Sequence, residues 1–209
     1  GDKLQMMLQA NNEAPDMVIQ TNTRKISSPE LVKRLEGEGV SVQNHPWMID
    51  CLVLADTGRL EQLPAFQEGL FYVQDAAAKL AVLCAQLPRD SKVLDSCAAP
   101  GGKSFAAAMA MQGSGSIISC DFYAHKAELI AGGAKRLGLT NITARQQDAT
   151  TFCPDWQDRF DTVIADVPCS GLGVIRKKPD IRYKDLQQTE ALPGIQLAIL
   201  EQQSRYVKP

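Results

Sequence analysis

The chain has 209 residues, of which 44% are hydrophobic, and its 22 basic and 24 acidic side chains give a formal net charge of −2. This length supports one sizeable core and a smaller module. The balanced charge excludes a uniformly basic nucleic-acid-binding protein, so any RNA contact must rest on local patches. No apolar run approaches the roughly 18 residues of a membrane span, and no signal peptide opens the chain. We therefore expect a cytoplasmic protein without membrane contact.

The cysteines give no sign of a metal site or of a disulfide framework. The six cysteines form no C-x-x-C pair, and the chain has only two histidines. This pattern argues against zinc and fits a reducing cytosol. We expect no metal in this protein.

The first third of the chain predicts a small module of helices and strands. A strand at 17–20 is followed by a helix start at 27–30, where serine, proline and glutamate stand in the order typical of a first turn. Apolar residues at helical spacing continue that helix, and 40–42 and 51–54 are expected to be strands. We expect an α+β module with its connecting segment over residues 1–75.

From there strands and helices alternate, which defines the second predicted domain, 76–209. The expected strands are 92–95, 116–120, 142–145 and 160–165, and the expected helices are 75–83, 105–111, 124–137 and 195–206. Such alternation predicts a parallel sheet with helices on both faces and a ligand at the carboxyl ends of the strands. The expected fold class is α/β, with a Rossmann-like sheet preceded by the small α+β module.

A turn of small residues joins the strand at 92–95 to the next helix, and it runs Asp-Ser-Cys-Ala-Ala-Pro-Gly-Gly-Lys-Ser from residue 95. A glycine turn at a helix N-terminus brings backbone against a ligand, as in nucleotide sites. The turn matches the end of a phosphate loop, but Cys97 stands where the first glycine should be. Asp95 would repel a phosphate and could pair with a cationic group. S-adenosylmethionine, which has an ammonium and a sulfonium but no phosphate, therefore fits better than a nucleoside triphosphate; a plain glycine turn is the alternative.

An aspartate ends or follows each of four predicted strands, at positions 95, 121, 148 and 166. Asp121 is placed to accept from both ribose hydroxyls of an adenosyl ligand, because a carboxylate can take two hydrogen bonds at once. Asp148 could accept from the adenine amino group. The alternative for each acid is a cap on the following helix. Four successive strand ends together favour the adenosyl ligand.

Cys169 stands beside a proline in a glycine-rich loop after the last predicted strand. Methylation of carbon 5 of a pyrimidine needs such a thiol, because a thiolate that adds to carbon 6 turns the ring into an enamine able to attack a methyl group. Asp166, three residues earlier, could bond the exocyclic amino group and ring nitrogen of cytosine. A buried structural cysteine is the alternative.

These segments resemble the Sun/Fmu (RsmB-type) RNA cytosine-C5 methyltransferases. The turn from Asp95 to Ser104 is similar to motif I of that family, and the Asp166–Gly171 segment to motif IV. The stretches 63–69, 72–75 and 173–181 match as well, and the last favours the RsmB branch. The resemblance covers residues 17 to 209.

The resemblance implies a Rossmann-like methyltransferase domain after a small RNA-binding module, with one cytosine of bacterial small-subunit ribosomal RNA as substrate. Its cofactor is S-adenosylmethionine. The cofactor-binding residues that it implies are Cys97, Ala98, Ala99, Pro100, Gly101, Gly102, Lys103, Asp121, Asp148 and Asp166.

Two departures from the family pattern bear on activity. No helical NusB-like domain opens this chain. The family's attacking cysteine follows a Lys-Pro-Gly-Gly turn on the next strand, and this chain ends at Pro209, before that turn. Cys169 matches the family's second cysteine, which assists release of the methylated product by β-elimination.

We therefore expect catalytic roles for Cys169 and Asp166 and a main nucleophile beyond Pro209. The expectation is a fragment that binds S-adenosylmethionine weakly without turnover. An active enzyme with Cys169 as the attacking thiol is the alternative.

A run of cations follows motif IV, with only two acids among them. Beside the target-base pocket, this run could neutralise RNA phosphates, and Tyr183 could stack on a base. The alternative is a solvated charged loop. The predicted RNA-binding residues are Arg176, Lys177, Lys178, Arg182 and Lys184.

Other functions stay open at the level of sequence. A methyltransferase of a small molecule or protein would share Asp95 and Asp121 but has no need for Cys169. A methyltransferase of tRNA or another RNA and a non-catalytic cofactor-binding scaffold are further alternatives. The expected partner is ribosomal RNA, and the expected oligomeric state is a monomer.

Overall fold

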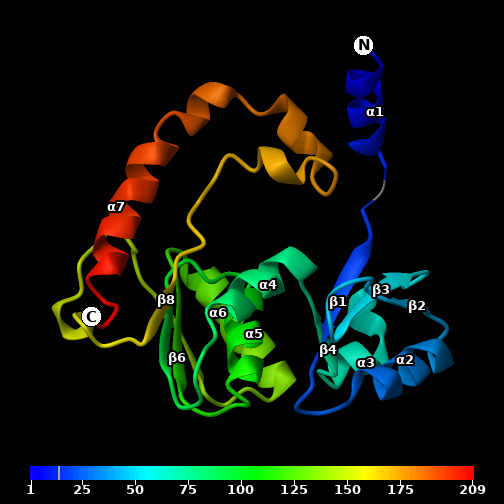
Figure 1. Ribbon diagram of the computed structural model, residues 1–209, viewed down its shortest axis with the longest axis horizontal. Helices are drawn as coiled ribbons and strands as arrows, with labels where there is room; N and C mark the ends of the chain where they lie inside the picture. The colour runs from blue at the N-terminus through cyan, green and yellow to red at the C-terminus, as the bar shows by residue number, and fades with distance from the viewer. Residues whose placement is uncertain (14) are drawn as a thin grey trace.

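The computed structural model describes residues 1–13 and 15–209 of the chain. Two four-stranded sheets lie beside each other in it, one from each half of the chain (Figure 1). The strands of one sheet lie within residues 17–73 and those of the other within residues 92–164.

The first sheet consists of β1 (Met17–Thr21), β2 (Ser41–Asn44), β3 (Cys51–Ala55) and β4 (Phe71–Val73). It is antiparallel throughout, with the strand order β2-β3-β1-β4. Its helices are α2 (Ser28–Gly37) and the short α3 (Pro64–Gln67). The predicted start of α2 is confirmed, because Ser27 and Glu30 form a capping box there.

The second sheet consists of β5 (Lys92–Asp95), β6 (Ser116–Asp121), β7 (Ile142–Gln146) and β8 (Thr162–Ile164). All of its pairings are parallel, and the strand order is β7-β6-β5-β8. Its helices are α4 (Ala76–Cys84), α5 (Gly102–Ala110), α6 (Ala124–Leu137) and α7 (Leu192–Ser204). The predicted strands and helices of this half are confirmed to within a few residues at their ends.

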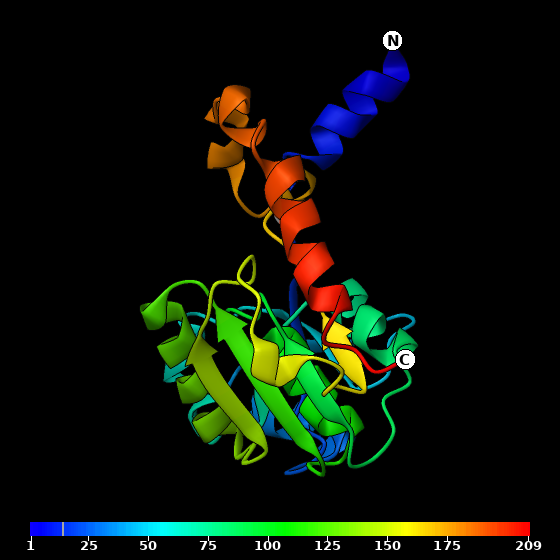
Figure 2. The same cartoon turned by 90° about the vertical axis from the view of Figure 1, so that its left-hand side faces the viewer.

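The helices α4, α5 and α6 all lie on the face of the second sheet that is turned toward the first sheet (Figures 1 and 2). Val93 packs there with Ala107 of α5 and Ile130 of α6. Leu94, the next residue of β5, packs on the opposite face with Phe160 and Tyr206. Our expectation of helices on both faces is met in part, because the 3-10 helix Pro154–Trp156 and Tyr206, just after the end of α7, pack on that opposite face. Both β-α-β crossovers run in the same direction along the sheet, and their right-handed sense places α5 and α6 on one face.

Side chains that reach backbone carbonyls hold the first sheet against the end of α6. Asn22 Nδ2 donates to Gly69 O at 2.8 Å and to Leu137 O at 2.9 Å. The Arg136 guanidinium lies 3.8 Å from the centroid of the Phe66 ring and also donates to Phe66 O. The position of the first sheet beside the second is thus fixed by buried polar contacts as well as by apolar packing.

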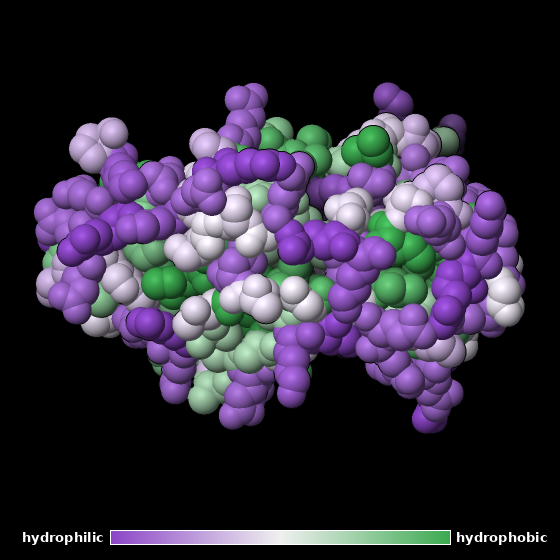
Figure 3. All heavy atoms as spheres, turned by 90° about the horizontal axis from the view of Figure 1, so that it is seen from below, coloured by the Kyte–Doolittle hydropathy of each residue, from purple (hydrophilic) through white to green (hydrophobic). Residues whose placement is uncertain are grey.

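Between β8 and α7 the chain leaves the sheet and forms an arch above it (Figure 1). The arch contains three short 3-10 turns, Leu172–Val174, Pro179–Tyr183 and Leu186–Thr189. The N-terminal helix α1 (Asp2–Ala10) extends in the same direction and buries none of its residues. None of the helices that the structure describes is long and apolar enough to cross a membrane. The surface opposite the arch is mainly hydrophilic, with hydrophobic side chains in separate patches (Figure 3).

Candidate functional site

The turn between β5 and α5 has the sharp geometry that its glycines suggest. Gly101 caps α5 with a φ of +110°, a conformation that favours glycine. A Cβ atom there would overlap the ring of Phe105, so the turn also requires the missing side chain. The first helical hydrogen bond runs from Phe105 N to Gly101 O, at 2.9 Å. The backbone N–H groups of Gly102 and Lys103 precede that bond and have no partner within the helix ladder.

Asp95 lies fully buried behind this turn rather than open at the tip of its strand. Ser104 Oγ donates to Asp95 Oδ2 at 2.7 Å, and Ser119 Oγ lies 2.7 Å from Ser104 Oγ. Burial raises the pKa of Asp95 to about 6, against the opposing effect of the Ser104 hydrogen bond. Asp95 Oδ1 has no hydrogen-bond partner in the part of the chain that the structure describes. One oxygen of this buried carboxylate therefore stays available to a ligand.

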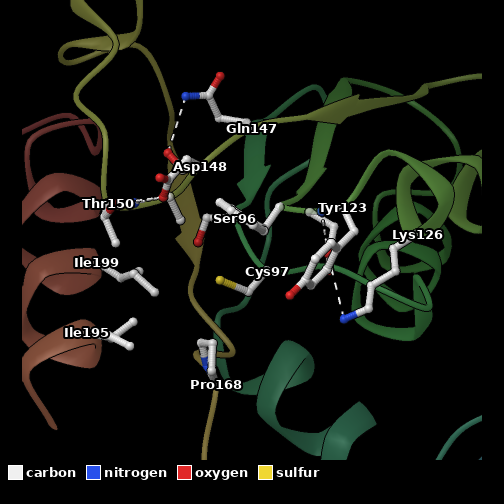
Figure 4. A pocket seen from close by; sticks show the side chains of 13 residues that line it. Ser96, Cys97, Tyr123, Lys126, Gln147, Asp148, Thr150, Pro168, Ile195 and Ile199 are labelled. Carbon is white, nitrogen blue, oxygen red and sulfur yellow. Dashed lines mark hydrogen bonds and ion pairs between the residues drawn. The ribbon is translucent and has the colours of Figure 1, made fainter. Parts of the chain in front are cut away.

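A cavity of about 380 Å³ opens at the carboxyl ends of β5, β6 and β7 (Figure 4). Three of the predicted cofactor residues, Cys97, Asp121 and Asp148, line it. Its remaining wall comes from the segments after these strands, from Pro168 and from one face of α7. The other lining residues are Ser96, Phe122, Tyr123, Lys126, Gln147, Ala149, Thr150, Pro168, Ile195 and Ile199.

Asp121 ends β6 at the edge of this cavity and is 8% exposed. Its Oδ1 accepts a hydrogen bond from Tyr123 N at 3.2 Å and lies 3.9 Å from Lys126 Nζ. Asp148 Oδ1 accepts from both N and Oγ1 of Thr150, at 2.9 and 2.7 Å. Asp148 therefore stabilises its own turn and caps no helix there, while it also lines the cavity.

Cys97 forms part of the cavity wall with a thiol that stays protonated. Burial raises the pKa of this thiol to about 11. A cysteine nucleophile must be a thiolate. Cys97 is therefore suited to packing against a ligand and not to attacking one.

A second, smaller cavity of about 190 Å³ lies on the other side of Cys97, which lines both. Predicted cofactor residues make up much of its wall, namely Cys97, Ala98, Ala99, Pro100, Gly102, Lys103 and Asp166. The other lining residues are Val73, Gln74, Ala78 and Asp95. Gly101 shapes the turn behind this wall. The two cavities share Cys97 as a wall residue at the end of β5, and we call them together the crevice.

Asp166 and Cys169 stand in the loop that leaves β8. Asp166 forms an ion pair with Lys103, with 2.6 Å between its Oδ2 and the lysine Nζ. Cys169 is exposed and follows Pro168, which lines the larger cavity and whose carbonyl accepts from Gln196 Nε2 at 2.8 Å. The structure thus brings motifs I and IV together at the crevice and leaves the Cys169 thiol open to solvent.

The predicted RNA-binding cations lie on the arch, near Tyr183, which is 91% exposed. Lys177 forms an ion pair with Asp75, directly before α4. Lys184 Nζ donates to Ser170 O at 3.3 Å, and Arg182 donates to Asn11 O at 2.8 Å. The arch is therefore tied to the start of α4 through Lys177 and to the end of α1 through Arg182.

Sequence reasoning missed a group of residues that line the crevice: Val73, Gln74, Phe122, Tyr123, Lys126, Gln147, Thr150, Ile195 and Ile199. Two signals could have found some of them. Phe122 directly follows the acid that ends β6, and Ile195 and Ile199 recur at helical spacing on α7. Val73 and Gln74 lie in the stretch 72–75 that matches the family, but apolar periodicity gives no sign that they line the crevice.

A parallel sheet with a glycine turn after β5 and an acid-lined crevice at its carboxyl edge defines a Rossmann-like methyltransferase, a class whose cofactor is S-adenosylmethionine. More narrowly, the chain belongs to the RsmB/F family of 16S rRNA methyltransferases, whose family model matches residues 82–209. The ferredoxin-like domain of RsmF/B-like methyltransferases matches residues 1–61. The predicted resemblance to RsmB-type enzymes is therefore confirmed.

Individual relatives agree with this assignment. The chain is 37% identical over 196 residues to the probable ribosomal RNA small subunit methyltransferase B of Bacillus subtilis (strain 168), covering 93% of this chain and 44% of the relative. The crystal structure of PH0851 has a TM-score of 0.93 and 27% identity, covering 100% of this chain and 48% of that one. A methyltransferase homolog protein from Pyrococcus horikoshii has a TM-score of 0.81 and 26% identity, covering 96% and 64%. The chain spans about half the length of the curated relatives it matches.

Proposed function

We propose that this chain forms the cofactor-binding part of an enzyme that methylates carbon 5 of a cytosine in small-subunit ribosomal RNA. The observation that carries the proposal is the crevice itself, in which Asp121 and Asp148 line one cavity, the motif I turn lines the other, and Cys97 joins them. Membership of a family of 16S rRNA methyltransferases supports the substrate class.

The residues of the larger cavity suit the adenosyl half of the cofactor. About 380 Å³ is within the range of small-molecule sites. In our proposal Asp121 accepts from the ribose hydroxyls, and Asp148 lies beside the adenine amino group. Phe122, Ile195 and Ile199 supply apolar surface for the ring. When bound, S-adenosylmethionine supplies an electrophilic methyl group, and these residues orient it.

The loop after β8 would receive the target base. Cys169 is exposed there, and Asp166 is 60% exposed at its side chain. In our proposal the Asp166 carboxylate accepts hydrogen bonds from the amino group of the cytosine and from its ring nitrogen in the protonated form. Cys169 assists release of the methylated product from a covalent adduct at carbon 6.

The arch would bind the RNA backbone near that base. Its cations would neutralise phosphates, and Tyr183 would stack on a neighbouring base, which makes the binding salt-dependent. The small N-terminal module is part of the same proposed RNA surface. A cytoplasmic location and a monomeric state complete the proposal.

Calorimetric titration of this chain with S-adenosylhomocysteine, with ATP as the control ligand, tests the proposal. The expected result is binding of S-adenosylhomocysteine alone, because Asp95 and Asp121 oppose a phosphate-bearing ligand. Binding of ATP alone would contradict the methyltransferase assignment of the crevice.

A further inference from the structure

The smaller cavity contains two buried hydrogen-bond acceptors without partners. Asp95 Oδ1 and Gln74 Oε1 have none among the described residues, and both of these residues line that cavity. A buried polar atom without a hydrogen-bond partner destabilises the folded protein. Two such acceptors in the wall of one cavity therefore indicate a ligand that carries hydrogen-bond donors. Three further unpaired oxygens, on Gln20, Asn141 and Gln203, belong to residues that do not line it.

The backbone of Gln74 is held in place from the first sheet. Gln74 follows β4 directly, its N–H donates to Val18 O at 3.2 Å, and Gln20 Nε2 donates to Gln74 O at 3.0 Å. Its side chain then reaches the N-terminus of α5, where a Cβ atom on Gly102 would come within 3.2 Å of Gln74 Nε2. A residue of the first sheet is therefore fixed against the motif I turn of the second.

The same cavity also contains donors. Lys103 lines it, and the N–H groups of Gly102 and Lys103 stand at the positive end of α5. A group that presents an ammonium to the acceptors and a carboxylate to the donors would satisfy both sets. The amino-acid end of S-adenosylmethionine has this chemistry, and the smaller cavity lies next to the one that suits the adenosyl half.

We propose that Gln74 is a cofactor-binding residue, and that its Oε1 together with Asp95 Oδ1 binds the ammonium group of the methyl donor. The inference rests on the proposed function and extends it, because it makes the first sheet a contributor to the cofactor site. Asp95 is mainly ionised at neutral pH, since its raised pKa of about 6 still lies below 7. The charge of the carboxylate then favours the ammonium over a neutral group.

The test compares two ligands by calorimetry on the whole chain at pH 7.5. S-adenosylhomocysteine has the amino-acid end, and 5′-methylthioadenosine lacks it while keeping the adenosyl thioether. Gln74→Met removes the acceptor at nearly constant length. We expect the affinity of this variant for S-adenosylhomocysteine to fall about 10-fold or more, as for a lost hydrogen bond to a charged group, with no change for 5′-methylthioadenosine.

Two further variants control this experiment. Gln74→Glu restores an acceptor and adds a negative charge, so it should bind S-adenosylhomocysteine at least as tightly as the parent chain. Asn141→Leu removes another amide with an unpaired oxygen, at the start of β7 and away from both cavities, and should change neither affinity. If Gln74→Met does not fold, the parent chain can be titrated with S-adenosylhomocysteine that lacks its amino group. We expect this deaminated ligand to bind about 10-fold more weakly than S-adenosylhomocysteine itself.

The outcomes separate the two proposals. The role of Gln74 would be overturned if Gln74→Met lost the same affinity for both ligands, or if it lost no affinity for S-adenosylhomocysteine. The proposed function would still stand in either case. Equal binding of the deaminated ligand by the parent chain would also overturn that role and leave the proposed function standing. Failure of the parent chain to bind either adenosyl ligand would overturn both.

Discussion

Lys103 Nζ lies 2.6 Å from Asp166 Oδ2, and this ion pair joins the first turn of α5 to the loop that leaves β8. Both residues line the smaller cavity. Lys103 thus pairs with the side chain of Asp166, and in our proposal it also binds the carboxylate of the methyl donor. A cytosine that engages Asp166 would have to displace this lysine.

The Lys103→Met variant separates these roles from a role in stability. Because Asp166 is largely exposed, we expect the free energy of unfolding to change by less than about 1 kcal/mol. The affinity for S-adenosylhomocysteine should fall about 10-fold, since a charged donor to the ligand carboxylate is lost. Lys208→Met is the matched control, because Lys208 forms a similar 2.6 Å ion pair with Asp161 away from both cavities. Equal effects of the two variants on affinity would exclude a role of Lys103 in binding.

Asp95 makes the stability of the chain depend on pH in an unusual direction. Burial raises its pKa from 3.8 to about 6, so between these values the folded chain keeps a proton that the unfolded chain has released. Its contribution to stability is therefore fully present below about pH 4 and is lost as the pH rises through 6. Between pH 4.5 and 7.5 this loss is about 2 kcal/mol.

Asp95→Asn keeps an oxygen for Ser104 and does not titrate. Relative to the parent chain, this variant should gain about 2 kcal/mol in the free energy of unfolding when the pH is raised from 4.5 to 7.5. Urea denaturation of both proteins at the two pH values measures that difference. If the free energy of unfolding changed equally with pH in both proteins, Asp95 would not be the source of the pH dependence.

The contact between the first sheet and α6 can be tested with a pair of glycines. Gly69 and Gly39 both have a positive φ, of +70° and +83°. A Cβ atom on Gly69 would overlap the carbonyl of Arg136, whereas one on Gly39 would meet nothing within 4 Å. Gly39→Ala should lower the free energy of unfolding by about 1 kcal/mol, from backbone strain alone. Gly69→Ala should lower it by about 1–3 kcal/mol more, because of the overlap. Equal losses in urea denaturation would mean that the two sheets are not packed as described.

The basic arch predicts a salt-dependent interaction with RNA. Lys178→Gln combined with Arg182→Gln should weaken binding to a single-stranded ribosomal RNA fragment and lower the slope of log K against log[salt] by about 1. Fluorescence anisotropy over a series of salt concentrations measures both quantities. Lys33→Gln on the exposed face of α2 is the control. An unchanged slope in the double variant would remove the arch from the RNA surface.

The sequence predicts those parts of the fold that depend on local pattern. The strands of the second sheet, the capping box of α2 and the turn at Gly101 all follow from apolar periodicity or from residues with special backbone preferences. The aspartates at the strand ends could be assigned to a ligand site because parallel strands bring their carboxyl ends to one edge.

The remaining features depend on contacts between distant segments. The strand order determines which face α5 and α6 cover. That order places β8 beside β5, although β6 and β7 lie between them in the sequence. Asp95 is buried because Ser104 and Ser119 close over it. Gln74 lines the crevice because Tyr72 of the first sheet packs against Phe105 of α5, and the family match over 72–75 does not reveal that contact.

A crystal structure of this chain with S-adenosylhomocysteine would show directly whether the crevice is the cofactor site. We expect the ribose hydroxyls on the Asp121 carboxylate, the adenine beside Asp148, and the amino-acid end between Asp95, Gln74 and Lys103. A ligand bound outside this crevice, or one lying in it with the adenine at Asp95, would show that the proposed site is wrong.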